Sequence, residues 1–125
     1  KLGISTVDGL ESLLNALMIL HVHQPISGNK IASLSCSGGE ASLIADLAEQ
    51  FNFRFPKLSS KQKRKLKSVL GDLVHLSNPL DYQTYVWNDQ VKLTMAFKSM
   101  MEEPYDFLFI IMDFLVINKS LINKF

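Results

Sequence analysis

Residues 30–51 constrain the fold of this sequence more than any other stretch. They contain a short apolar run, then a turn of small residues at positions 35–39, and then a segment in which apolar residues recur at helical spacing. This order predicts a buried strand, a tight turn and a helix. A turn of small residues lets backbone N–H groups converge at the helix start, where the helix dipole also favours an anion such as a phosphate.

Strand and helix patterns alternate after this unit. Further strands are predicted at residues 51–55, 73–76 and 107–112, and further helices at residues 60–70 and 90–102. Ser59 with Gln62 and, later, Asp89 supply the predicted helix caps. The apolar run 107–112 is typical of a strand buried on both faces. The alternation favours an α/β open fold over residues 28–125, with a parallel sheet covered by helices on both sides.

A leading segment, residues 1–27, is predicted to contain a helix and a linker. The helix is expected at residues 5–21, because Ser5 and Asp8 have capping-box spacing and leucines recur along one face. Pro25 and Gly28 then interrupt the helical pattern. We expect this helix either to pack on the following domain or to connect it to something that precedes it.

The composition fits one globular domain, because the chain has 125 residues and 47% of them are hydrophobic. With a formal net charge of +1, the chain lacks the overall positive potential that would attract nucleic acid. No apolar stretch has the length of a membrane span. With a single cysteine, Cys36, and no visible signal peptide, the cytoplasm is the predicted location. Because the sequence starts at Lys1 rather than Met, a trimmed start or a fragment is one expectation.

Two polar loops are predicted to face one crevice, since ligands of open parallel sheets bind beyond the carboxyl ends of the strands. The first loop contains Ser37, Gly38 and Gly39, and the second contains Asn78 and Asp81. One interpretation is an anion or phosphate site at the first loop, flanked by the second. The other is a tight turn plus a loop held by Asn and Asp side-chain capping, and the pattern alone supports both equally.

Other chemically suggestive residues have simpler structural explanations. Cys36 lies near a predicted helix start, but the sequence shows no base beside it, so a small buried residue is favoured over a nucleophile. His21 and His23 lack the spacing of metal ligands on a helix, and His75, in a short apolar run, is interpreted as structural rather than catalytic, so no metal site is predicted. The basic residues between positions 57 and 67 are predicted to form the solvated outer face of a helix.

Three stretches together resemble one domain of the NDP-forming acyl-CoA synthetases, a family that includes succinyl-CoA synthetase and the ADP-forming acetate–CoA ligases. These stretches read GNKIASLSCSGGEASLIADLAE, LSNPLDYQTYVW and EEPYDFLFIIMDF. The resemblance covers residues 28–114. The SGG turn and the NPLD loop at this separation are fairly specific in combination, whereas either motif alone is not.

The resemblance implies a flavodoxin-like ligase domain, the second of two in the complete enzyme. The complete enzyme also has a CoA-binding Rossmann domain and an ATP-grasp domain, uses ATP or GTP, CoA and Mg²⁺, and works through an acyl phosphate and a phosphohistidine. By the resemblance, Ser37, Gly38, Gly39 and Glu40 match a helix start that faces the phosphohistidine. Asn78 and Asp81 match a second motif of the same site.

The departures from the family define what this chain can do. It has no Rossmann fingerprint, no ATP-grasp sequence and no histidine at a position matching the phosphorylated one, and the resemblance stops after Asp113. We therefore expect no catalytic residue and no bound cofactor in this chain alone, with other domains or subunits of a synthetase as its partners. One alternative is a stand-alone truncated domain that self-associates through its first helix or its apolar tail. A weaker one is a small-molecule or nucleotide-binding protein.

Overall fold

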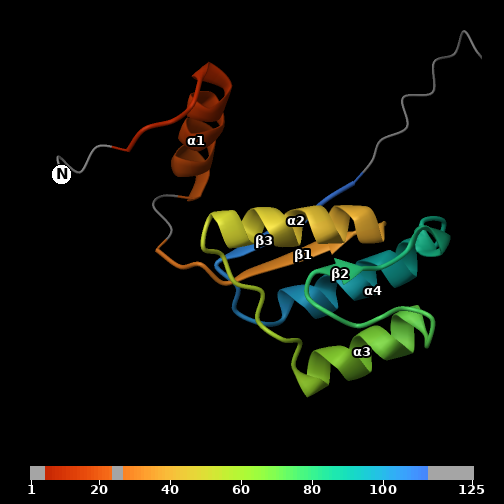
Figure 1. Ribbon diagram of the computed structural model, residues 1–125. Helices are drawn as coiled ribbons and strands as arrows, with labels where there is room; N and C mark the ends of the chain where they lie inside the picture. Colours follow the sequence, from red (N-terminus) through yellow and green to blue (C-terminus); the bar gives the residue numbers. More distant parts are fainter. Residues whose placement is uncertain (1–4, 24–26, 113–125) are drawn as a thin grey trace, which may run out of the picture.

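The computed structural model describes residues 5–23 and 27–112. Its elements, in chain order, are α1 (Leu10–His23), β1 (Ile31–Ser35), α2 (Gly38–Gln50), α3 (Ser60–Leu70), β2 (Leu80–Asp81), a 3₁₀ turn (Thr84–Val86), α4 (Gln90–Met101) and β3 (Phe107–Ile110) (Figure 1). No described helix combines the length and the apolar character needed to cross a membrane.

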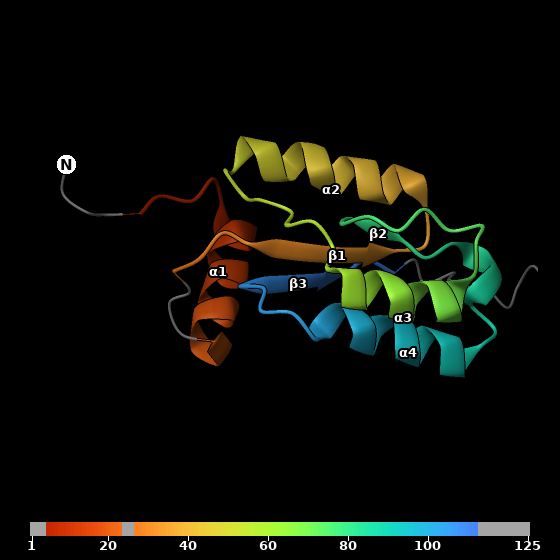
Figure 2. The same ribbon diagram turned by 90° about the horizontal axis from the view of Figure 1, so that it is seen from below.

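The sheet has three parallel strands in the order β2-β1-β3. In its register Leu34 pairs with Leu80 on one side, and Ile31 pairs with Phe107 on the other. Helix α2 covers one face, and α3 and α4 lie together on the opposite face (Figure 2). The predicted α/β class, with a parallel sheet flanked by helices, is confirmed.

The main core lies between β1 and the α3–α4 pair. Ala32 and Leu34 of β1 are fully buried in it, together with Leu66 of α3 and Met100 of α4. The alternate residues of β1, among them Ile31 and Ser33, are buried as well. Strand β1 is therefore covered on both faces and is the central element of the fold.

Local signals predicted the later helices closely. The capping box of Ser59 and Gln62 is present at the start of α3, and Gly71, with a φ of 78°, follows its last residue. Asp89 caps α4 as predicted, by accepting a hydrogen bond from the backbone N–H of Lys92 at 3.0 Å. The basic residues of α3 are exposed, and Lys61 and Lys65 both pair with Glu102.

The Asp89 cap leads to a pH prediction. The hydrogen bond from the Lys92 backbone lowers the pKa of the Asp89 carboxyl, so the folded state favours the ionised form. The stability that the ionised Asp89 carboxylate adds to the folded state is fully present above the ordinary aspartate pKa. It is lost as the pH falls through the lowered pKa that this carboxyl has in the folded state. We expect Asp89→Asn, which keeps a capping side chain, to flatten this part of the acid-unfolding profile measured by circular dichroism. A profile identical to that of the unchanged protein would contradict the assignment.

Two predicted strands are wrong in detail. Residues 73–76 form no strand. The strand that pairs with β1 on this side is instead β2, which is only two residues long. Residues 51–55 form no strand either, because Asn52 has a positive φ of 57° and only Arg54 reaches β1, in a single parallel bridge with Lys30. The edge of β1 opposite β3 is thus paired by two separate short segments, Arg54 and β2, rather than by one continuous strand.

Strand β3 differs from its prediction in burial. It is the edge strand of the described sheet, and Phe109 and Ile110 are 39% and 46% exposed. The prediction of burial on both faces is wrong because no described element covers the outer part of β3. Residues 113–125, which include the apolar tail, lie outside the described residues.

Helix α1 begins at Leu10, so the predicted capping box of Ser5 and Asp8 does not start it. None of its residues is buried, and its large apolar side chains are exposed. Figure 1 shows α1 outside the layers formed by the sheet and the other helices. Of the two alternatives for this helix, packing on the domain is not observed among the described residues.

Candidate functional site

The candidate site lies where β1 ends and α2 begins. Ser37 has an extended backbone and caps α2 with its hydroxyl, which accepts a hydrogen bond from the Glu40 backbone N–H at 3.4 Å. Gly38 and Gly39 are the first two residues of the helix. Backbone N–H groups in a first helical turn have no intrahelical acceptor, so this turn can donate hydrogen bonds to an anion.

The second loop places Asp81 beside this turn. Asp81 is the last residue of β2 and pairs with Ser35, the last residue of β1. A Cβ built on Gly38 would lie 3.6 Å from the Asp81 carboxylate, which is an ordinary van der Waals distance. The backbone N–H and the side-chain amide of Gln83 donate to the same carboxylate, at 2.9 and 2.7 Å. The structure therefore brings Asp81 next to Gly38 and fixes its side chain there.

Glu40 turns back into the loop. Its carboxylate accepts hydrogen bonds from the backbone N–H of Cys36 at 3.2 Å and from the Cys36 thiol at 3.5 Å. Cys36 itself is buried. The Glu40 side chain thus stabilises the turn between β1 and α2 by bonding to Cys36. Cys36 is a small buried residue of that turn, in agreement with the interpretation favoured from the sequence.

Asn78 points to the body of the sheet. Its side-chain oxygen accepts a hydrogen bond from the backbone N–H of Ser33 at 3.2 Å, and its amide group donates to the carbonyls of Ile31 and Pro56 at 3.0 and 3.1 Å. These are the contacts a neighbouring strand would make with β1, between the bridge at Arg54 and the pairing at β2. The Asn78 side chain therefore takes the place of a neighbouring strand along this part of β1. Of the two residues of the second loop, only Asp81 lies beside the start of α2.

The charge around the turn is negative. Besides Glu40 and Asp81, the buried Tyr82 lies close by, and burial is the main cause that raises the pKa of its phenol, with both carboxylates adding to the effect. The backbone donors of α2 and these carboxylates together suit a ligand that has anionic oxygens next to a cationic or hydrogen-donating group. Sequence reasoning missed Gln83, whose role depends on a positive φ of 68° that no local pattern signals.

Other candidate residues lie away from this site. His21 and His23 are exposed in the last turn of α1, and His75 is exposed in the loop before β2. In the part of the chain that the structure describes, no group of three or more His, Cys, Asp or Glu residues is arranged to hold a metal ion.

Comparison with known proteins relates part of the chain to one enzyme. No family model matches the sequence. Over 79 residues, which make up 63% of the chain, it is 29% identical to the ADP-forming acetate–CoA ligase of Methanocaldococcus jannaschii. The matched part covers 11% of the length of that protein. This similarity supports an acyl-CoA synthetase-like relationship for the chain.

Proposed function

We propose that this chain is a domain or fragment of an NDP-forming acyl-CoA synthetase, and that the start of α2 helps to bind the phosphoryl group carried by the phosphohistidine of that enzyme. The observation that carries the proposal is the helix start at Ser37, Gly38 and Gly39, directly after a buried parallel strand. The partial similarity to an acetate–CoA ligase supports the proposed reaction class.

The two glycines leave the approach to the helix start open. A Cβ built on Gly38 or Gly39 would meet no heavy atom closer than 3.6 Å, so the fold does not require glycine for packing at either position. Without side chains there, phosphoryl oxygens can come within hydrogen-bonding distance of the backbone N–H groups. Phosphoryl transfer relies mainly on such positioning and on stabilisation of the charge on the transferred group.

The carboxylates explain why the ligand would be a phosphorylated histidine rather than free phosphate. Glu40 and Asp81 repel a bare phosphate dianion at the helix start. An imidazole ring bound to the phosphoryl group carries an N–H that a carboxylate such as Asp81 can accept. The histidine would come from another domain or subunit, so the chain alone is expected neither to catalyse acyl-CoA formation nor to retain phosphate.

Substitution of the glycines in the complete synthetase that contains this chain tests the proposal. We expect Gly39→Leu to lower the rate of acyl-CoA formation, and the rate of dephosphorylation of the phosphoenzyme by nucleoside diphosphate, at least about tenfold. The added side chain blocks the approach to the backbone donors. Gly39→Ala should give a smaller loss in the same direction.

Gly9→Leu is the matched control, since a Cβ at Gly9 meets nothing within 4 Å and Gly9 precedes α1 rather than α2. Circular dichroism verifies that each variant is folded. Folded Gly39→Leu enzyme with unchanged rates would show that this helix start does not bind the phosphoryl group.

A second candidate function is self-association of a stand-alone domain, favoured by the exposed apolar side chains of α1. Leu13, Leu14 and Leu17 share one helix face and are each more than 40% exposed. Sedimentation of the chain over a range of concentrations tests this candidate. A dimer that Leu14→Ser dissociates would support it, and a monomer at every concentration would reject it.

A further inference from the structure

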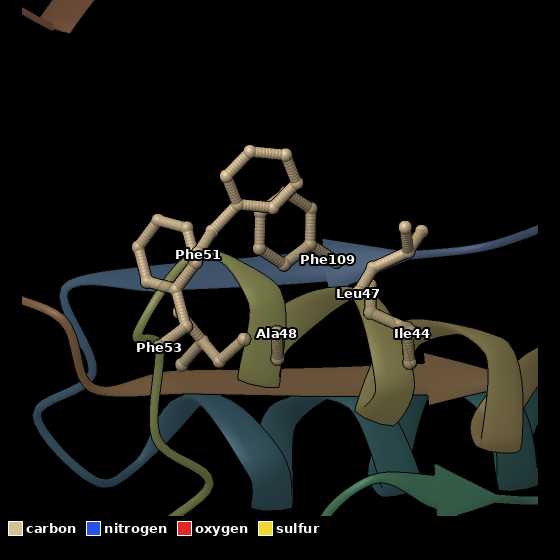
Figure 3. Close-up of a pocket in the computed structure, with 7 residues that line it drawn as sticks. Ile44, Leu47, Ala48, Phe51, Phe53 and Phe109 are labelled. Atoms are coloured by element: carbon tan, nitrogen blue, oxygen red, sulfur yellow. The ribbon is translucent and has the colours of Figure 1, made fainter.

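An apolar groove lies along α2 and β3, on the face of the sheet opposite α3 and α4 (Figure 2). It has a volume of about 220 Å³, and its lining residues are all apolar. Leu47 of α2 and Phe51, the residue after this helix, line it together with Phe109 of β3 (Figure 3). Leu43, four residues before Leu47, is exposed as well. An exposed apolar stripe therefore runs along α2 into the groove.

We propose that this groove binds α1 of a second copy of the chain, and that two copies form a dimer in which each inserts its α1 into the groove of the other. The inference rests on the self-association given above as the second candidate function, and it names the surface that receives α1. Within one copy, α1 lies outside the layers of the domain, and none of its residues is buried (Figure 1). Among residues 5–23 and 27–112, each copy thus presents both an apolar helix and an apolar groove without a partner.

The surface of α1 fits an apolar groove. One face of the helix consists of exposed leucines at the spacing i, i+3, i+4 and i+7, which are Leu10, Leu13, Leu14 and Leu17. Glu11 is the one acidic residue of α1, which has no lysine or arginine, and it lies outside this face. The leucine face can therefore enter the groove without burying a charge. Of the described helices, α1 alone has no buried residue, whereas α2, α3 and α4 each bury residues in their own domain.

The area of contact favours a reciprocal dimer over one-sided docking. Helix α1 has 14 residues and is about 21 Å long. If it contributes half the surface of a cylinder about 10 Å wide, α1 and the groove together bury about 650 Å² in one contact. A single contact is smaller than the roughly 1,200 Å² of a stable interface, whereas two contacts bury about 1,300 Å². Reciprocal insertion also closes the assembly as a two-fold dimer.

Two substitutions in the full chain test the contact from both sides, with the dimer dissociation constant measured by sedimentation equilibrium. We expect Leu17→Ser in α1 and Phe51→Ser at the groove each to raise this constant at least about tenfold, because each weakens an apolar contact that occurs twice in the dimer. Ile19→Ser, on the opposite face of α1, and Val91→Ser, on α4, are the matched controls and should leave the constant unchanged. Ile19 is 49% exposed against 53% for Leu17, and Val91 and Phe51 are both 69% exposed.

Mixing the two variants identifies the surface that receives α1. In a mixed dimer, the intact α1 of the Phe51→Ser chain meets the intact groove of the Leu17→Ser chain, so one of the two contacts is restored. We therefore expect the mixture to associate more tightly than either variant alone. Dissociation by Leu17→Ser but not by Phe51→Ser would overturn the groove assignment while leaving self-association through α1 in place. A monomer at every concentration would reject self-association itself, and this inference with it.

A distance measurement keeps the proposal testable if a groove variant does not fold. A nitroxide attached at Asn15→Cys, on the exposed side of α1 away from the leucine face, is mixed with an unlabelled copy; Cys36 is buried and escapes labelling. We expect the NMR methyl signals of Ile44 and Leu47, which line the groove, to broaden in the unlabelled copy. Broadening confined to the labelled copy would assign the groove to its own α1, and no broadening in either copy would assign it to another occupant. Either result would overturn the proposal.

Discussion

We expect Asn78→Ala to lower the free energy of unfolding by about 3 kcal/mol, as measured by urea denaturation. The substitution removes three hydrogen bonds, to the backbone of Ser33, Ile31 and Pro56. Two of these groups belong to β1, which is buried on both faces, so they lose their partners where water cannot easily replace them. The magnitude is large for one polar residue because Asn78 completes the pairing of the central strand.

Graded variants separate this explanation from a general effect of the loop. Asn78→Asp keeps an acceptor for the Ser33 N–H but loses both donors and places a charge against the carbonyls of Ile31 and Pro56, so it should destabilise at least as much. Asn88→Ala, at an exposed position, should change the stability by less than about 0.5 kcal/mol. Equal stability of the two alanine variants would show that the Asn78 bonds do not hold β1.

Gln62→Leu should likewise cost about 3 kcal/mol of unfolding free energy. Gln62 is buried on α3, accepts from the Ser59 backbone N–H at 3.0 Å and donates to the Tyr105 hydroxyl and to the carbonyls of Ser99 and Met100. Leucine has a similar size and cannot make any of these bonds. The loss therefore comes from unpaired polar groups at the junction of α3 and α4 rather than from a cavity.

Gln50→Leu is the control for this prediction, because Gln50 is exposed at the end of α2. It should leave the unfolding free energy within about 0.5 kcal/mol of the unchanged protein. A Gln62→Leu protein as stable as this control would mean that the buried amide contributes nothing beyond its volume.

How much of the fold could be predicted depended on how local each determinant is. The caps at Ser59 and Asp89 act within one helical turn, and both helices begin where these residues placed them. The edge of β1 is different, because the partner of Ser33 is a side chain 45 positions away. An asparagine side chain that takes the place of a neighbouring strand looks in sequence like an ordinary loop residue. The pattern therefore predicts the neighbour of β1 in the nearby run 73–76, which forms no strand.

The candidate site was predictable to the same extent. The rule that loops follow the carboxyl ends of parallel strands correctly brought Asp81 and Gly38 together. It could not predict where side chains within those loops would point. Glu40 turns toward Cys36, and Asn78 turns toward β1, because unpaired backbone groups there need partners that the spacing of the motifs does not reveal.

The piecewise pairing of β1 has a consequence for aggregation. The Asn78 amide already occupies the backbone groups that an incoming strand of another molecule would use, and β2, with two residues, is too short to act as a template. Among residues 5–23 and 27–112, nothing protects the outer edge of β3 in either way, and its sequence Phe-Leu-Phe-Ile is strongly apolar. Intermolecular strand pairing, and with it the first step of fibril growth, is therefore expected to start at β3.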